Sequence, residues 1–338
     1  MSTVLDSLNG SLHDLMSSDD RVIVLGEDIL DPYGGAFKVT RGLSSRFPDR
    51  VLTTPISEAA IVGLASGLAL RGLRPVAEIM FGDFLFLAGD QIVNHAAKFR
   101  WMYNDAVRVP LVIRAPMGGR RGYGPTHSQS IEKHFMGVPG LSIVAPHVLG
   151  EPGQLLRQAT LECDDPVVFI ESKTCYARPL AAAPPGTTRD IIADEASPFP
   201  TVHIRQDSTT SGDGILWCYG GMVPHGLEAI VQLRDREGLS IDLVAVSQLS
   251  PVPVSHIRRV VEARQPAVSV YAEEASTAFG WSSEILAQVD AVIASAGARP
   301  VRHARIGGAS TPIPSSRDLE RRTLPQVDDL VARVLECF

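Results

Sequence analysis

The stretch T53-T-P-I-S-E-A-A-I-V-G-L-A-S-G-L-A-L70 carries one ionisable side chain, Glu58, among small and branched apolar residues. Its composition predicts a helix over residues 58–71 that is buried on every face, because no polar side is present. Buried helices of this kind pack on the faces of parallel sheets. The stretch therefore points to an α/β fold, and it places a single carboxylate at the entrance of a buried helix.

Short apolar runs alternate with helical patterns on both sides of this helix. In the first half we expect helices at 4–17, 90–100 and 149–163, and strands at 21–26, 76–80, 109–114, 141–145 and 166–171. In the second half we expect strands at 215–219, 241–246 and 267–271, and helices at 224–237, 254–264 and 280–296. Such alternation predicts parallel sheets that helices cover on both faces.

The alternation stops between Arg178 and Gly214, where Pro, Ser, Thr and Ala dominate. Segments of this composition are typical of connections rather than of helices or strands. We therefore expect two doubly wound α/β domains, residues 1–180 and 213–338, joined by a linker over residues 181–212.

Composition excludes several classes of function. The net charge of −7 argues against nucleic acid as the main partner, because phosphate binding requires clustered Lys and Arg. The four cysteines are widely spaced and form no CxxC pair, which speaks against a zinc site and suits a reducing compartment. The acidic N-terminus has no apolar signal core, and residues 51–70 contain too many polar groups for a membrane span. We expect a cytoplasmic protein without a membrane partner.

Glu58 has two interpretations at this point. Ser57 is a good helix N-cap, and a glutamate at the first helical position interacts favourably with the helix dipole, by roughly 0.3–1 kcal/mol. Against this structural interpretation stands the apolar surrounding, since a carboxylate that loses its solvation commonly marks a functional site.

A second candidate lies in the glycine-rich loop G118-G-R-R-G-Y-G-P-T-H-S-Q129, which follows the strand predicted at 109–114. Loops at the carboxyl edge of a parallel sheet form the ligand sites of open α/β folds. His127 in this loop is suited to proton transfer near neutral pH. A histidine in a loop is also commonly structural or merely exposed, so both interpretations stay open.

Familiar phosphate-binding motifs are missing from the sequence. G212-D-G214 resembles the start of a Mg²⁺-diphosphate loop, but that loop requires an asparagine some 25–30 residues later, and no asparagine follows Gly214. We therefore expect a polar turn that leads into the strand at Ile215. No GxGxxG or GxxxxGK[ST] element follows a predicted strand either, and we predict no metal ligands in this chain.

Several segments in order resemble one known family. They are V24-L-G-E-D28, Y33-G-G-A-F-K-V-T-R-G-L43, R50-V-L-T-T-P-I-S-E58, G72-L-R-P-V-A-E-I79, D90-Q-I-V-N-H-A-A-K98, T126-H-S-Q-S130 and Y271-A-E-E-A-S-T-A-F-G-W-S-S-E-I285. Together they are similar to the beta subunit of the thiamine-diphosphate-dependent, decarboxylating component of 2-oxoacid dehydrogenase complexes. The resemblance covers nearly the whole chain.

The resemblance implies a pyrimidine-binding domain followed by a transketolase C-terminal-like domain. It also implies an alpha subunit that carries the diphosphate and Mg²⁺ site, in an α₂β₂ assembly, which accounts for the missing diphosphate motif. The implied reaction is decarboxylation of a 2-oxo acid and transfer of the acyl unit to a lipoyl-bearing acyltransferase or carrier. The family can also hold a potassium ion through main-chain carbonyls, here near residues 141–166.

The family's functional residues fall on four positions of this sequence. Glu58 matches the glutamate that hydrogen-bonds the N1′ atom of the cofactor's aminopyrimidine, and Ile56 and Phe84 match residues that flank this ring. His127 matches the active-site histidine implied to steady the substrate or intermediate and to assist transfer to the lipoyl group. Packing in the core is the alternative role for Phe84.

The sequence departs from the family pattern in two places. Ser247 and Pro253 stand where an arginine and an aspartate are common, and Arg120 and Arg121 make the glycine-rich loop unusually basic. The two arginines either recognise an anionic substrate group or face solvent or a partner chain. The first interpretation suggests cleavage of a ketose phosphate with two-carbon transfer to a carrier. A non-catalytic assembly subunit is the third alternative.

Overall fold

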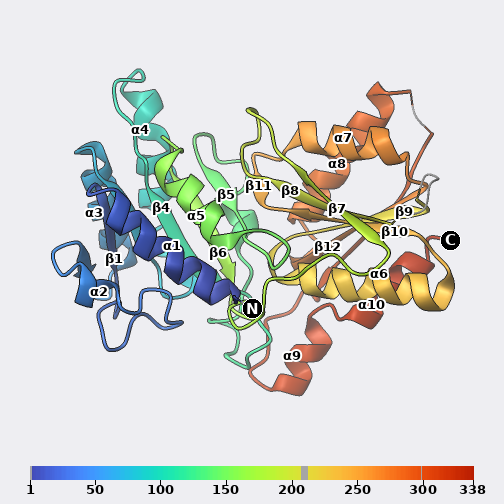
Figure 1. The fold of residues 1–338 in the computed structure, drawn as a ribbon, viewed down its shortest axis with the longest axis horizontal. Coiled ribbons are helices and arrows are strands. Elements are labelled where there is room, and N and C mark those ends of the chain that lie inside the picture. Colours follow the sequence, from blue (N-terminus) through green and yellow to red (C-terminus); the bar gives the residue numbers. More distant parts are fainter. Residues whose placement is uncertain (1, 207–211, 298) are drawn as a thin grey trace.

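The computed structural model describes residues 2–206, 212–297 and 299–338. Figure 1 shows two α/β units side by side, with the N-terminal half (blue to green) on the left and the C-terminal half (yellow to red) on the right. Each unit is a central sheet with helices on both faces. The α/β class and the two-domain architecture predicted from the sequence are confirmed.

The first sheet has seven strands in the described residues. In spatial order they are β11 (Gln248–Ser250), β5 (Ser142–Val144), β6 (Val167–Ser172), β4 (Val112–Met117), β3 (Arg74–Glu78), β1 (Val22–Gly26) and β2 (Val51–Thr53). All neighbouring strands are parallel except β11 and β5. The carboxyl ends of the parallel strands therefore meet at one edge, where ligands bind in open α/β sheets.

Alternating side chains of these strands enter two separate cores. Val76, Val112 and Phe169 point to the face covered by α1 (Val4–Ser18) and α5 (Pro152–Leu161). Ala77 and Ile113 point to the opposite face, which α3 (Glu58–Leu70), the π-helix η2 (Gln91–Ala96) and α4 (Ala97–Met102) cover. This period of two is expected for strands buried on both faces. The short helices α2 (Leu43–Arg46), η1 (Gly82–Phe86) and η3 (Glu132–His134) lie in connections.

The second sheet is mixed rather than fully parallel. Its order in the described residues is β13 (Arg302–Gly308), β12 (Val268–Ser276), β9 (Gly214–Cys218), β10 (Ile241–Val246), β8 (Thr201–Gln206) and β7 (Thr187–Ile192). The first four strands are parallel, whereas β8 is antiparallel to both β10 and β7. Helices α6 (Val223–Glu237) and α10 (Val327–Leu335) cover one face, and α7 (Val254–Arg264) and α8 (Trp281–Ser295) cover the other (Figure 1).

The segment predicted as a linker, residues 181–212, is corrected by the structure in one respect. It carries β7 and β8, which extend the second sheet through an antiparallel hairpin. Its Pro- and Ser-rich composition concealed both strands. β7 lies at the sheet edge and is only partly buried, whereas β8 is buried between β10 and β7. Residues 207–211 of the predicted linker lie outside the described part of the chain.

The two domains share a sheet and both hydrophobic cores. β11, which follows β10 of the second domain, pairs antiparallel with β5 of the first sheet, with Gln248 opposite Val144. Each hydrophobic core also runs through both domains. The second domain therefore completes the first sheet.

Several further elements differ from the sequence-based expectation. The helix predicted at 90–100 is a π-helix, η2, that continues into α4, and π-helical turns are rare outside functional sites. β13, α9 (Arg317–Thr323) and α10 were not predicted, and neither was the 3₁₀-helix η4 (Gly220–Met222). Among the described residues, no helix has the length and apolar character that crossing a bilayer requires.

Candidate active site

The candidate residues gather at the carboxyl edge of the first sheet. Glu27 follows β1, Glu58 follows β2, Phe84 follows β3 and His127 follows β4. The strand order β2–β1–β3–β4 places these connections next to one another. The topology thus brings together residues that are far apart in the sequence, at the edge where this fold class binds ligands.

Glu58 is the first residue of α3, and only 5% of its surface is exposed. The predicted cap is wrong in its detail, because the Ser57 hydroxyl makes no capping hydrogen bond. In the described residues, no group donates a hydrogen bond to the Glu58 carboxylate. A buried carboxylate with unused acceptor positions requires a donor from elsewhere.

Glu27 is the neighbour of Glu58 in this acidic site. Burial raises the pKa of the Glu27 carboxyl above its usual range, and the negative charges of Glu58 and Asp28 raise it further. One oxygen of Glu27, Oε1, is buried and has no hydrogen-bond partner in the described residues. Glu27 is 5% exposed, so two buried carboxylates, Glu27 and Glu58, lie together at this edge of the sheet.

Helix α3 is not buried on every face, contrary to the sequence-based prediction. Ile61, Val62 and Ala65 enter the core, whereas Leu64 is 50% exposed and Leu70 is 38% exposed. Apolar composition alone does not distinguish a helix covered by its own chain from one that a partner covers. The exposed apolar face, on the helix that begins with Glu58, has the character of a contact surface.

Phe84 and His127 are in direct contact on the other side of the edge. Their ring centroids lie 5.2 Å apart in an edge-to-face arrangement, and Phe81 contacts the His127 ring at 4.8 Å. The Thr126 hydroxyl lies 2.9 Å from Nδ1 of His127. These contacts leave Nε2 of His127 as the ring nitrogen available to a ligand.

Ile56 is 84% exposed and lies two residues before Glu58, outside the core. Phe84 is half-buried and packs on the second core, so its core role and its ring contact with His127 coexist. The structure places Glu58 with Glu27, and Phe84 with His127, as two groups along one sheet edge.

Arg120 and Arg121 make contacts within the chain. Nε of Arg120 lies 3.3 Å from Oε2 of Glu274, and its Nη2 donates to the carbonyl of Pro325 at 2.6 Å. Nη2 of Arg121 donates to the carbonyl of Lys173 at 2.7 Å. The guanidinium groups thus fasten the glycine-rich loop to β6 and to the second domain, which weakens the argument that they recognise an anionic substrate.

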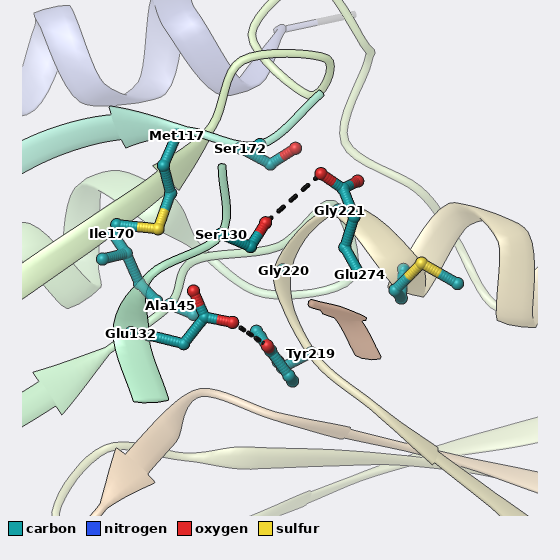
Figure 2. A pocket seen from close by; sticks show the side chains of 12 residues that line it. Met117, Ser130, Glu132, Ala145, Ile170, Ser172, Tyr219, Gly220, Gly221 and Glu274 are labelled. Atoms are coloured by element: carbon teal, nitrogen blue, oxygen red, sulfur yellow. Dashed lines mark hydrogen bonds between the residues drawn. The ribbon is translucent and has the colours of Figure 1, made fainter. Parts of the chain in front are cut away.

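A small cavity lies where this loop meets the second domain, and Figure 2 shows the carboxylates around it. Its volume is about 30 Å³, the space of one water molecule. Ser130 donates to Glu274 at 3.3 Å, and the Tyr219 hydroxyl donates to Glu132. Burial raises the pKa of both Glu132 and Tyr219. Glu273 and Glu274 lie within β12 and are buried.

A buried ion-pair network stands behind the edge. Nε and Nη2 of Arg114 each donate at 2.7 Å to Glu171, and Nη1 donates at 2.5 Å to Glu78. The Tyr176 hydroxyl donates to Glu171 at 2.6 Å. The network joins the ends of β3, β4 and β6, so it fixes the strands from which Phe84 and His127 follow.

The turn Gly212–Gly214 has the structural role expected for it. The main-chain N–H of Ser240 donates to the Asp213 carboxylate at 2.7 Å, and β9 begins at Gly214. Among residues 2–206, 212–297 and 299–338, no three His, Cys, Asp or Glu side chains are grouped as metal ligands.

Three residues of the site did not emerge as candidates from sequence reasoning: Glu27, Phe81 and Lys173. Each follows a predicted strand by one to three residues, which is the signal that was available. Glu27 is one of two adjacent acids, which are commonly solvated, and Lys173 has no motif around it. Their burial and contacts are visible only in the folded chain.

Two family models match the chain. The transketolase pyrimidine-binding domain matches residues 3–179, and the transketolase C-terminal domain matches residues 207–330. Subunit beta-2 of the mitochondrial pyruvate dehydrogenase E1 component of Oryza sativa subsp. japonica is 34% identical over 330 residues, which are 97% of this chain and 84% of that protein. The beta subunit of 3-methyl-2-oxobutanoate dehydrogenase of Mycobacterium tuberculosis is 33% identical over 98% of this chain and 92% of that protein.

A solved structure shares the fold at lower identity. It is described as a split gene transketolase in an inactive beta4 tetramer, and it superposes with a TM-score of 0.72 at 21% identity, covering 100% of this chain and 98% of that one. At this identity the likeness concerns the fold alone.

Proposed function

The chain belongs to the beta subunits of thiamine-diphosphate-dependent 2-oxoacid dehydrogenases, and from this premise we propose that its Glu58 forms half of an active site shared with an alpha subunit. The observation that carries the proposal is the buried, unpartnered carboxylate of Glu58 beside Glu27. The absence of a diphosphate motif from the sequence supports a second chain as the holder of the phosphates.

The residues present fit the aminopyrimidine half of thiamine diphosphate. This ring requires a carboxylate that accepts or shares a proton at a ring nitrogen, and Glu58 has unused acceptor positions in the described residues. It also requires apolar contacts on its faces, which the exposed Ile56 and the ring of Phe84 supply. Both requirements are met at one sheet edge.

Each residue of this chain has a defined task in the proposal. Thiamine diphosphate, when bound, supplies the electron sink that decarboxylation of a 2-oxo acid requires. Glu58 holds a proton at the ring nitrogen, and the buried Glu27 lies beside it. Ile56 and Phe84 orient the ring and exclude water. His127 presents Nε2 to the substrate side, where it holds or donates a proton during acyl transfer.

The partners follow from this division of labour. We place Mg²⁺ and the diphosphate on the alpha subunit, in an α₂β₂ assembly, and we take a lipoyl-bearing acyltransferase or carrier as the acyl acceptor. The exposed apolar face of α3, with Leu64 and Leu70, supports a partner that packs along the helix beginning with Glu58. A potassium ion near residues 141–166, held by main-chain carbonyls, is part of the proposal. The four free cysteines suit a cytoplasmic location.

Substitution of Glu58 tests the function. Glu58→Gln in the reconstituted complex is expected to lower the rate of acyl transfer from a 2-oxo acid to a lipoyl domain by about 10²–10⁴-fold, the usual contribution of a positioned acid or base. Glu162→Gln, an exposed carboxylate next to β6, is the matched control and should leave the rate unchanged. Unchanged turnover of Glu58→Gln would show that this chain is a non-catalytic assembly subunit.

A further inference from the structure

Lys173 is a buried lysine immediately after β6, with 0% of its surface exposed. Within the described part of the chain, no carboxylate lies at ion-pair distance from its Nζ atom. Burying an ammonium group without a direct counter-charge costs several kcal/mol, and an apolar side chain of similar length would stabilise the fold more. A role other than stability is therefore required to explain this residue.

The ammonium group of Lys173 contacts the candidate site directly. Nζ donates a short hydrogen bond to the main-chain carbonyl of His127. It also lies 5.0 Å from the ring centroid of Phe81 and 5.4 Å from that of Tyr123, which is the distance range of cation–π attraction. Phe81 in turn contacts the His127 ring at 4.8 Å. Lys173 thus holds both the main chain and the ring environment of His127.

The main chain of Lys173 holds the other end of the same loop. Its carbonyl accepts the 2.7 Å hydrogen bond from Arg121, and its N–H donates to the carbonyl of Met117 at 3.1 Å. The intervening loop contains three glycines at positive φ, Gly118, Gly122 and Gly124, and Arg120 holds its middle through Glu274 and Pro325. Lys173 contacts the loop at its start and at its functional end.

We propose that Lys173 is a positioning residue for His127: its ammonium group clamps the His127 carbonyl, so that the imidazole stays against Phe81 and Phe84 with Nε2 toward the substrate. The inference rests on the proposed function, because it assumes that the position of His127 matters for acyl transfer. The clamp itself is a property of this chain and is measurable without the reaction.

The charge state of Lys173 gives the clamp a pH dependence. Burial lowers the pKa of the Lys173 ammonium to about 8. The negative charges of Asp83, Glu274 and Glu320 oppose this shift of the pKa, and the positive charge of Arg121 adds to it. Below this pH the charged group makes a strong hydrogen bond to the carbonyl. As pH rises through about 8, the neutral amine becomes a weaker donor and the loop loosens.

Activity and stability together test the clamp. In the reconstituted complex, Lys173→Met is expected to lower kcat for acyl transfer about 10–100-fold, as expected for a misplaced catalytic group, with KM for the 2-oxo acid within about twofold of wild type. Its Tm should equal or exceed that of wild type, because a buried charge is removed. A fall of Tm in parallel with kcat, or an unchanged kcat, overturns the proposal. Lys173→Arg, which stays charged, should move the alkaline fall of kcat at least one pH unit higher, and an unmoved alkaline limb also overturns it.

The imidazole of His127 provides a readout that does not depend on turnover. With ¹⁵N-labelled histidine, and with His127→Asn to identify the signal, Lys173→Met is expected to broaden or shift the His127 ring resonances and to change their titration. Identical resonances and titration in both proteins would refute the clamp. If His127→Asn leaves acyl transfer intact, the proposed role of His127 fails, whereas the resonances still decide whether Lys173 positions it.

Discussion

Replacement of Arg114 by methionine removes the guanidinium group of the buried ion-pair network behind the site. Arg114 is 0% exposed and donates three charge-assisted hydrogen bonds, two to Glu171 and one to Glu78. Methionine fills a similar volume without a charge, so the change removes the guanidinium and leaves two buried carboxylates unpaired. Glu78 and Glu171 themselves are only 4% and 1% exposed.

The expected cost follows from these contacts. Each of the three bonds is worth about 1.5–3 kcal/mol, but the loss of the guanidinium also removes its own desolvation cost. Breaking a buried ion pair by deleting one partner costs about 3–5 kcal/mol net. For a domain of this size, that corresponds to a fall in Tm of roughly 6–20 °C.

Urea unfolding of the isolated chain at pH 7 measures the effect. Arg258→Met is the matched control, because Arg258 forms an exposed helical pair with Glu262 at 3.3 Å that is worth at most about 0.5 kcal/mol. Adding Glu78→Gln to Arg114→Met should restore at least about 1 kcal/mol, since one unpaired charge disappears. An Arg114→Met protein within about 1 kcal/mol of wild type, or strictly additive variants, would refute the reasoning.

Two further predictions concern the domain boundary and the subunit contact. Burial raises the pKa of Glu273 to about 7, so between about pH 4.5 and 7 the folded chain keeps a proton that the unfolded chain has lost. The free energy of unfolding therefore falls as pH rises through this window. In urea titrations between pH 5 and 8, Glu273→Gln should remove up to about 3 kcal/mol of this fall. An equal pH dependence of the free energy of unfolding in both proteins would contradict this prediction. Leu64→Arg, on the exposed face of α3, should change the free energy of unfolding by less than about 0.5 kcal/mol but weaken association with the alpha subunit in sedimentation velocity, and an intact heteromer argues against this contact surface.

The regular elements could be predicted because their signal is local. Helix α1 and strands β4 and β10 were recognisable from periodicity, since each buries residues at the spacing of its own backbone. β7 was missed because edge strands carry mixed composition, and β8 because its six residues stand within a Pro- and Ser-rich segment. β11 was missed because its three residues are recognisable as a strand only through their pairing with β5. When two paired strands are distant in sequence, neither segment carries a local pattern that identifies the other.

The candidate site residues carried two kinds of signal in the sequence. Glu58 and His127 stood out from their own surroundings, whereas Phe84 was identified only by the order of matching segments. The structure places all three along one sheet edge. Glu27 and Lys173 are recognisable only in the folded chain. The neighbouring sequence does not show that Oε1 of Glu27 lacks a hydrogen-bond partner or that Nζ of Lys173 donates to a main-chain carbonyl. The exposed face of α3 was not predicted either, because the sequence of one chain does not show which apolar face of a helix a partner covers.

The position of β11 has a consequence for the order in which the protein is made. β5 and its neighbours leave the ribosome about 100 residues before Gln248–Ser250, at synthesis rates of roughly 5–20 residues per second. During those seconds the nascent first sheet ends in an open strand edge, which is a template for pairing with another chain. A fragment of residues 1–180 keeps this edge permanently. Folding yield should therefore depend on prompt completion of the second domain, and fragments of the first domain should aggregate more than the whole chain.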